Sequence, residues 1–268
     1  MSFKEKSTKT KFLLWFWGIF IFGFLFAVTL FTLISVEFFG PMPTFEELEN
    51  PRSNLASEII SEDHKLLGTY YIQNRTFVEF DELSPNLVNA LLATEDIRFY
   101  KHSGIDARGL ARVAVKTIAM GQSGSGGGST ITQQLAKNLF PRDTSIYSSS
   151  VARFSKLAIA KFKEWITAVK LERNFTKNEI LAMYLNTVPF GSNAFGIKAA
   201  SKTFFNTTPD SLTIEQAAVL VGVVNAPTRY SPVRNPERSL QRRNFVLSQM
   251  KKYGFIDPLL YDSISQIP

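Results

Sequence analysis

The feature that most constrains this chain is an uncharged apolar run near its N-terminus. From Phe12 to Val36 there are 25 residues without a charge, mainly Phe, Trp, Leu, Ile and Val. At about 1.5 Å per residue, a helix of this length crosses the roughly 30 Å hydrocarbon core of a bilayer. A cleaved signal peptide has a shorter apolar stretch and a small-residue cleavage site, which the sequence after Val36 does not resemble. The run therefore predicts a retained transmembrane helix over residues 12–36.

The charges around this run predict its orientation. Residues 1–11 carry four lysines against Glu5, a net +3 out of the formal +7 of the chain, whereas glutamates follow the run. Basic residues favour the cytoplasmic side, so we expect residues 1–11 to be a cytoplasmic tail and the rest of the chain to lie outside the cytoplasmic membrane. The chain has no cysteine, which excludes disulfides, thiolate zinc sites and cysteine nucleophiles.

The part after the run divides by composition and periodicity. Residues 37–55, rich in Pro, Glu and Asn, predict a stalk, and alternation over 56–82 predicts two or three short strands, the third over 76–80. Helical periodicity follows, so residues 56–258 are expected to form one mainly α domain, and 259–268 a C-terminal tail or the start of a following domain. Cap signals mark several expected helix starts: Ser84 before Pro85, Thr130 with Gln133, Thr176 with Glu179, and Thr213 with Gln216.

Glu95 is the first residue with a pattern suited to catalysis. It follows Leu91 by four residues and Leu92 by three, so it extends the apolar stripe of the helix that begins at Pro85. A partly desolvated carboxylate is a stronger base. The alternative is a structural glutamate, paired with an arginine or exposed at the helix end, and spacing alone favours that alternative. His102, as a lone histidine, is likewise more often structural than catalytic.

A glycine-rich loop and a basic segment suggest anion binding. The loop, Gly121 to Gly128, leads into the helix start at Thr130, where amides suit a phosphate, although the Gly-Lys-Ser/Thr of a nucleotide P-loop is absent. Residues 151–177 hold seven basic groups against Glu164 and Glu172. These features are either a flexible loop with a solvated helix or, together, a site for a polyanion. We expect no nucleic acid there, because the domain is expected to be exported.

Taken together, these segments resemble glycosyltransferase family 51, the peptidoglycan glycosyltransferase domain of class A penicillin-binding proteins and of monofunctional transglycosylases. Five blocks occur in the family's order over roughly residues 55–255. They are Glu95-Asp96-Ile-Arg-Phe99-Tyr-Lys-His102-Ser-Gly104; Gly127-Gly128-Ser129-Thr130-Ile-Thr132-Gln133-Gln134 with Lys137-Asn138; Lys161-Phe-Lys-Glu164; Ile180-Leu181-Ala-Met-Tyr184-Leu185-Asn186; and Arg242-Arg243-Asn-Phe-Val246-Leu247.

The resemblance implies a lysozyme-like helical fold with a small membrane-contacting subdomain. It also implies a bacterial inner-membrane enzyme that polymerises lipid II into glycan strands, with inversion at the anomeric carbon and release of undecaprenyl pyrophosphate. The implied partners are lipid II, the lipid-linked glycan chain, the bilayer and other cell-wall synthesis proteins. The chain's end at Pro268 suits either a monofunctional enzyme or the front of a bifunctional one, and the stalk and strands favour the second.

The resemblance also implies roles for residues. Glu95 would be the general base at the acceptor 4-hydroxyl, and Glu164 a second catalytic carboxylate. Glu164 would orient Lys161 or hold a divalent cation, Mg²⁺ or Mn²⁺, against the pyrophosphate; no other cofactor is implied. The other matching residues are expected to bind substrate: Asp96, Phe99, His102, Gly104, Gly128, Ser129, Thr130, Thr132, Gln133, Gln134, Lys137, Asn138, Lys161, Tyr184 and Asn186.

Two departures and two rival functions qualify the resemblance. Ala160 stands where the family usually has Arg, so one phosphate contact is either absent or supplied by Lys163 or Arg153; Ala182 replaces a common Glu. The rivals are a lytic enzyme on a lysozyme-like scaffold and a non-enzymatic, membrane-tethered scaffold of wall synthesis. Phe140, Phe154 and Phe162 lie in or beside the basic segment, which suggests a second contact with the membrane.

Overall fold

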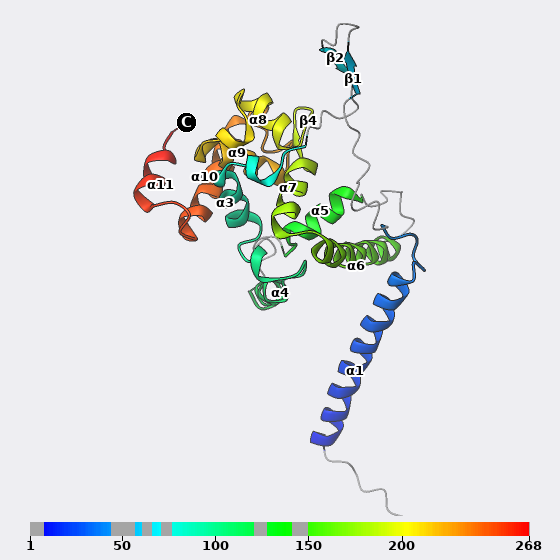
Figure 1. Cartoon of the computed structure of the whole chain (residues 1–268). Coiled ribbons are helices and arrows are strands. Elements are labelled where there is room, and N and C mark those ends of the chain that lie inside the picture. Colours follow the sequence, from blue (N-terminus) through cyan, green and yellow to red (C-terminus); the bar gives the residue numbers. More distant parts are fainter. Residues whose placement is uncertain are drawn as a thin grey trace, which may run out of the picture.

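The computed structural model describes residues 8–43, 57–60, 66–70, 77–120, 128–140 and 150–267. Its first element, α1 (Thr8–Ser35), projects as a single rod from a helical body (Figure 1). Within α1, residues 10–35 are long and apolar enough to cross a membrane. Large side chains along the rod are exposed, such as Trp15 with 74% of its surface accessible. The structure thus has an apolar helix of membrane-spanning length where the uncharged run predicts one.

The chain folds back on the body directly after α1. Lys163, on α6 (Ser150–Asn174), donates through Nζ to the carbonyls of Phe39 and Gly40 at 2.9 and 3.1 Å, and more weakly to that of Pro41 at 3.4 Å. The rings of Phe31 and Phe162 meet edge to face with centroids 5.0 Å apart. Residues 37–43 therefore form a packed turn, not the free spacer expected of a stalk, and residues 44–55 lie outside the described part of the chain.

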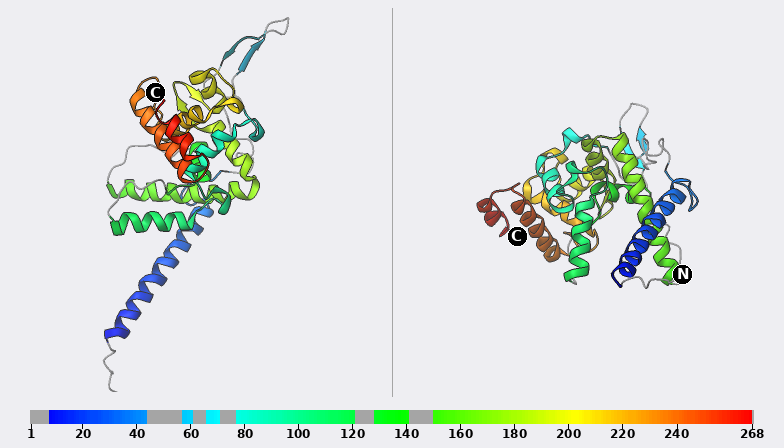
Figure 2. Two further views of the ribbon diagram at one scale, coloured as in Figure 1. Left: turned by 90° about the vertical axis from the view of Figure 1, so that its left-hand side faces the viewer. Right: turned by 90° about the horizontal axis from the view of Figure 1, so that it is seen from below.

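Helices dominate the body, as expected. They are α3 (Pro85–Glu95), α4 (Ala107–Met120), α5 (Ile131–Leu139), α6, α7 (Lys177–Thr187), α8 (Ile197–Phe205), α9 (Ile214–Asn225), α10 (Pro236–Lys252) and α11 (Pro258–Ile264). Figure 2 shows α4 and α6 toward the end of the body nearest α1, with α10 and α11 farther away. The body therefore has two distinct ends, one close to α1 and one remote from it.

Strands are short and few in the described residues. β1 (Ser57–Ile60) and β2 (Leu66–Tyr70) pair antiparallel with Ser57 opposite Tyr70, which confirms two of the expected strands. The third expected strand is wrong for residues 77–80, because a 3-10 turn (Phe80–Glu82) begins there. A second small hairpin joins β3 (Pro189–Gly191) to β4 (Ala194–Phe195).

The helix starts follow the cap signals in the sequence. Thr176 with Glu179 and Thr213 with Gln216 form reciprocal capping boxes. The Ser84 hydroxyl accepts from the Asn86 backbone N–H at 3.3 Å. At Thr130 only half of the expected box forms: its hydroxyl accepts from the Gln133 backbone, but the Gln133 side chain bonds elsewhere.

The core lies where α3, α9 and α10 pack together and continues to α5 and α7. Leu87 and Leu91 of α3 are fully buried there, as the apolar stripe predicts. The last helix, α11, belongs to the same core, since Ile264 is 5% exposed and the buried Arg243 of α10 donates to the carbonyls of Ile264 and Ser265. The structure therefore differs from the expected domain end at residue 258.

Candidate active site

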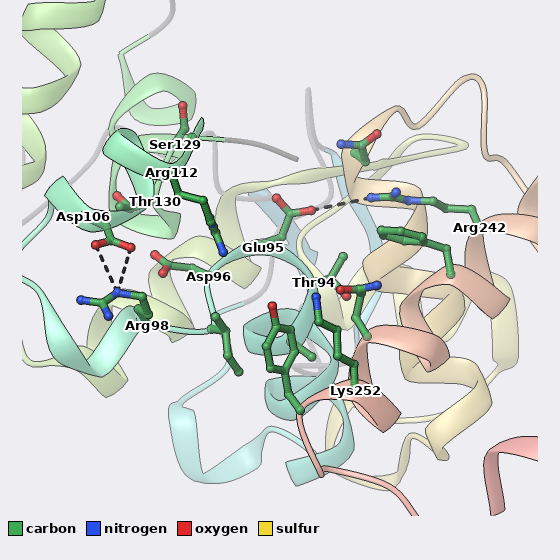
Figure 3. A pocket seen from close by; sticks show the side chains of 18 residues that line it. Thr94, Glu95, Asp96, Arg98, Asp106, Arg112, Ser129, Thr130, Arg242 and Lys252 are labelled. Atoms are coloured by element: carbon green, nitrogen blue, oxygen red, sulfur yellow. Dashed lines mark hydrogen bonds and ion pairs between the residues drawn. The ribbon is translucent and has the colours of Figure 1, made fainter. Parts of the chain in front are cut away.

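A cleft of about 710 Å³ opens where α3 ends. Glu95 lies between its two walls (Figure 3). One wall comes from α4, α5 and the segments before them: Arg98, Asp106, Gly109, Arg112, Gly128, Ser129 and Thr130. The other wall, here called the α10 wall, comes from the end of α9 and from α10: Asn225, Arg242, Phe245, Gln249, Lys252 and Tyr253.

The carboxylate of Glu95 is held from both walls. Its Oε2 accepts from Gln134 Nε2 at 2.8 Å, and its Oε1 lies 4.0 Å from Arg242 Nη2. The Glu95 side chain is 12% exposed and that of Arg242 16% exposed, so their attraction is only partly screened by water. Arg242 is fixed in turn by the ring of Phe245, whose centroid lies 4.7 Å from its guanidinium carbon.

A buried tyrosine fixes the amide that bonds Glu95. Tyr184 Oη donates to Gln134 Oε1 at 3.0 Å. Complete burial, reinforced by the negative charge of Glu95, holds the pKa of Tyr184 well above its usual range, so the hydroxyl stays a donor. Because a hydroxyl donor must face the amide oxygen, the amide nitrogen of Gln134 must face Glu95. The chain Tyr184–Gln134–Glu95 therefore leaves Oε1 as the oxygen without a direct hydrogen bond in the described structure.

A lysine and a serine form the other chemical centre. Lys161 Nζ donates to Ser129 Oγ at 2.7 Å and to Glu164 Oε2 at 3.1 Å. Lys161 is 31% exposed, whereas Glu164 is 6% exposed. Glu164 thus holds the lysine amine at the edge of the cleft wall that bears Ser129. We name Glu95, Gln134, Ser129 and Lys161 the cleft floor.

Behind the cleft floor lies a second polar group, named here the clasp. His102 Nε2 lies 3.1 Å from both oxygens of Asp96, and Asp96 Oδ2 accepts from the Ile131 backbone N–H at 3.2 Å. The side chains of Asp96 and His102 are about as buried as each other, at 5% and 4% exposure. Asp96 thereby ties the end of α3 to the start of α5, which sets the position of Glu95.

The clasp continues to α6 and α7. Lys177 Nζ donates to the His102 carbonyl at 2.7 Å and pairs with Glu172 at 2.7 Å, and Thr132 Oγ1 donates to Glu172 Oε1 at 2.6 Å. Lys177 also lies 4.2 Å from the centroid of the Phe99 ring. The clasp is therefore made of Asp96, His102, Thr132, Glu172 and Lys177, and its charges are satisfied by one another.

Several residues expected to bind substrate support the site instead. Phe99, Thr132, Gln133 and Asn186 are buried, and their described bonds go to protein groups; Asn186, for example, clasps the Val78 backbone in both directions. Gly104 has φ +84°, and a Cβ there would lie 2.9 Å from the Ala168 backbone, so this position packs α6 against the loop. Its carbonyl accepts from Thr130 and Gln133.

The remaining expected site residues divide between the cleft and the surface. Gly128, Ser129 and Thr130 line the cleft, with Asp96 beside them. Lys137 is exposed and Asn138 half-buried on α5, and neither lines the cleft. The three-dimensional contacts of α4 and α10 with the cleft had no local signal in the sequence, so Arg98, Arg112, Gln249 and Lys252 were missed; Arg242 stood in a matching block without a role.

The expectation for Lys163 is wrong. Its amine is occupied by the carbonyls of the turn after α1, so it does not replace the arginine that the family usually has at position 160. The side chain of Arg153 lies outside the described residues. Arg112 of α4 lines the cleft on the side of Ser129 (Figure 3) and is the arginine that the structure places there.

The expected divalent cation finds no ready ligand set. Within the described residues there is no group of three His, Asp or Glu side chains suited to a metal ion. Glu164 is already paired with Lys161. Of the two roles implied for Glu164, the geometry fits the orientation of Lys161, and dependence on Mg²⁺ or Mn²⁺ stays a prediction.

Most of the chain matches known proteins. The family model described as transglycosylase matches residues 63–251. Penicillin-binding protein 1A of Aquifex aeolicus (strain VF5) is 38% identical over 233 residues, 87% of this chain and 30% of that protein. Penicillin-binding protein 1A/1B of Bacillus subtilis (strain 168) is 38% identical over 263 residues, 91% of this chain and 27% of that protein.

A crystal structure of penicillin-binding protein 1A from Haemophilus influenzae matches 80% of this chain and 21% of that one, with 22% identity and a TM-score of 0.43. The chain spans less than a third of the length of the curated relatives named above. Because the transglycosylase family model covers most of the chain and contains both Glu95 and Lys161, the chain belongs to the transglycosylase family.

Proposed function

We propose that this chain is a peptidoglycan glycosyltransferase that polymerises lipid II, and that it is the glycosyltransferase part of a class A penicillin-binding protein. The observation that carries the proposal is Glu95, a mostly buried carboxylate held between Gln134 and Arg242, in a cleft that is also lined by Ser129, the acceptor of a hydrogen bond from Lys161. Such a site combines a base with a place for a departing anion. The match to the transglycosylase family and to relatives named penicillin-binding proteins supports the proposal.

The base acts through one defined oxygen. Because Gln134 occupies Oε2, the acceptor's 4-hydroxyl gives its proton to Oε1, which faces the cleft near Arg242. The acceptor oxygen then forms a bond to the anomeric carbon of the donor, while the bond from that carbon to the pyrophosphate oxygen breaks with both its electrons. General-base assistance of this kind contributes about 10² to 10⁴ in rate.

The leaving group needs positive charge and hydrogen-bond donors. As the C–O bond breaks, negative charge grows on the pyrophosphate, and fixed donors stabilise it most at that point. Ser129 and Arg112 line one wall of the cleft, and Lys161 donates to Ser129, so these three groups are suited to this task. Glu164 holds the Lys161 amine in place, so it acts through the lysine.

The membrane confines both lipid-linked substrates and the enzyme to one surface, which raises their effective concentration. We place the N-terminal tail in the cytoplasm and the body outside it, with α1 as the anchor. Of the three phenylalanines expected at a second membrane contact, only Phe154 is freely exposed, at 75%. Phe162 packs on Phe31, and Phe140 packs against the core. Phe154 and Val115 are thus the candidates for that contact.

The decisive experiment is polymerisation of lipid II by the full chain and by Glu95→Gln. We expect glycan strands from the wild type and at least a hundredfold less from the variant. The two proteins should unfold at the same temperature, because glutamine keeps the bond to Gln134. Full synthesis by Glu95→Gln would remove Glu95 as the base. Muropeptide release from sacculi by a wild type that makes no glycan would replace the proposal with the lytic function, and neither activity would favour a scaffold.

A further inference from the structure

The α10 wall carries a cation that the proposed chemistry does not use. Lys252 lines the cleft, and its described contact is the ring of Tyr253, with its centroid 5.1 Å from Nζ. The carboxylates that line the cleft are engaged elsewhere: Asp96 with His102, Asp106 with Arg98, and Glu95 with Gln134. None of the described residues on the α10 wall is acidic.

The adjacent lysine shows the contrast. Lys251 lies 3.8 Å from a carboxylate oxygen of Asp262, and its Nζ lies 3.7 Å from the centroid of the Tyr261 ring. It does not line the cleft. Two neighbouring lysines of one helix therefore differ: one is paired within the protein, and the other faces a cavity without a carboxylate partner on its wall.

Other groups of the α10 wall suit a polar, partly apolar ligand. Asn225 and Gln249 supply amides, and Phe245, 44% exposed, and Tyr253 supply ring surfaces. Arg242 Nε and the nearby Thr94 Oγ1 are buried and have no hydrogen-bond partner among the described residues. Buried polar atoms without partners are costly, so a ligand that supplied those bonds would be favoured.

The position of this wall decides which part of the substrate reaches it. Ser129 bonds to Lys161 of α6, the helix that contacts α1, whereas α10 lies farther from α1 (Figures 1 and 2). Lipid tails stay with the anchor, so their pyrophosphates belong to the near wall. What extends to the remote wall is the sugar and its peptide, and the anionic groups on that part are the carboxylates of the stem peptide.

We propose that the α10 wall is a subsite for the peptide-bearing sugar, in which Lys252 selects stem peptides with a free carboxylate. This rests on the proposed function, because it presumes that lipid II is the substrate. A lysine facing a carboxylate in a partly solvated cleft contributes a modest attraction, so the effect belongs to substrate preference and not to chemistry.

The test compares two substrates in vesicles containing the full chain. One is lipid II with free stem carboxylates, and the other is lipid II in which those carboxylates are amidated. We expect Lys252→Gln to raise KM about fivefold for the first substrate, to leave KM for the second within about twofold, and to leave kcat unchanged for both. Lys252→Glu should raise KM for the free carboxylates roughly tenfold or more.

Lys251→Gln is the matched control, and it should change neither KM. An equal rise for both substrates in Lys252→Gln would show that Lys252 contacts the pyrophosphate or the sugars, and no change with either substrate would show that it contacts neither; each result overturns the proposal. A wild type that makes no glycan from either substrate would instead overturn the proposed function, so the two failures are distinguishable.

Discussion

The cleft floor and the clasp come from the same stretches of sequence but use their charges differently. In the clasp, Glu172 is 4% exposed and is bonded by both Lys177 and Thr132, so its charge is matched within the protein. In the cleft floor, Lys161 is 31% exposed and also donates to Ser129, which lines the cleft, although it pairs with Glu164 at a comparable distance. A lysine–glutamate pair is thus suited to a structural role where other protein groups surround it, and to substrate binding where it borders a cleft.

The largest effect on stability should come from the clasp. We expect Glu172→Gln to lower the free energy of unfolding by about 3 kcal/mol, because it leaves the partly buried Lys177 without its counter-charge. Thermal or urea unfolding of the full chain in detergent measures this. A variant that unfolds like the wild type but makes no glycan would move Glu172 from the clasp to the chemistry and break the comparison.

Lys161→Ala should act mainly on binding. Removing the amine takes away a charge-assisted donor to the pyrophosphate, so we expect about tenfold weaker affinity for a pyrophosphate-bearing substrate. Glu164 loses a partner as well, so the unfolding temperature should fall by a few degrees; affinity is therefore titrated well below it.

Lys163→Ala is the control on the same helix. Its amine bonds the carbonyls of Phe39 and Gly40 and does not face the cleft, so substrate affinity should not change. Equal losses in the two variants would mean that α6 presents a diffuse positive charge and that the contact with Ser129 has no special role.

Tyr184→Phe tests the fixed amide behind Glu95. Without the hydroxyl, Gln134 is free to turn its oxygen toward the carboxylate, which repels it. We expect kcat to fall about threefold to tenfold with KM unchanged, the worth of one hydrogen bond. Tyr261→Phe, on the surface of α11, should have no such effect. A rise in KM alone would indicate that Tyr184 affects substrate binding instead.

Asp106 has features of both the cleft and the clasp. It lines the cleft, but its charge is paired with Arg98. Burial alone would raise its pKa, but the Gly109 backbone N–H and the Arg98 guanidinium outweigh burial and hold the pKa below its usual value. A lowered pKa adds stability above the unfolded-state value, near 4, and this stability is lost as the pH falls through the folded value.

Asp106→Asn should therefore cost about 1 kcal/mol of stability at pH 7, and the difference from the wild type should vanish as the pH falls through the lowered pKa of the folded state. Unfolding measured across this range checks the prediction. A difference that persists unchanged into acid would mean that the carboxylate charge contributes nothing at this position.

Local features of the structure were predictable, and distant contacts were not. The anchor and the helix starts at Ser84, Thr176 and Thr213 follow from composition and cap residues close in sequence. The pairing of Lys161 with Glu164 follows from helix spacing. Each of these contacts joins residues within about one helical turn of each other, and sequence patterns predict contacts over that range.

The α10 wall depends on tertiary packing. Arg242 reaches Glu95 because α10 packs against α3, and no periodicity in either segment indicates this. The role of Lys163 was misjudged for a similar reason: its partners are backbone carbonyls on a turn far away in the sequence, which carry no residue signal. The buried signature residues, such as Phe99 and Asn186, were assigned to substrate because a motif does not separate a site's lining from its support.

The bond of Lys163 to backbone carbonyls has a consequence for how this chain can change. Every residue type offers the same carbonyl oxygen, so side chains at positions 39 and 41 are free to vary while the attachment of the anchor persists. The length of the turn is not free, because an inserted residue would shift each carbonyl out of the reach of one amine. This part of the attachment therefore depends on chain geometry and not on side-chain identity, whereas the packing of Phe31 on Phe162 depends on both rings.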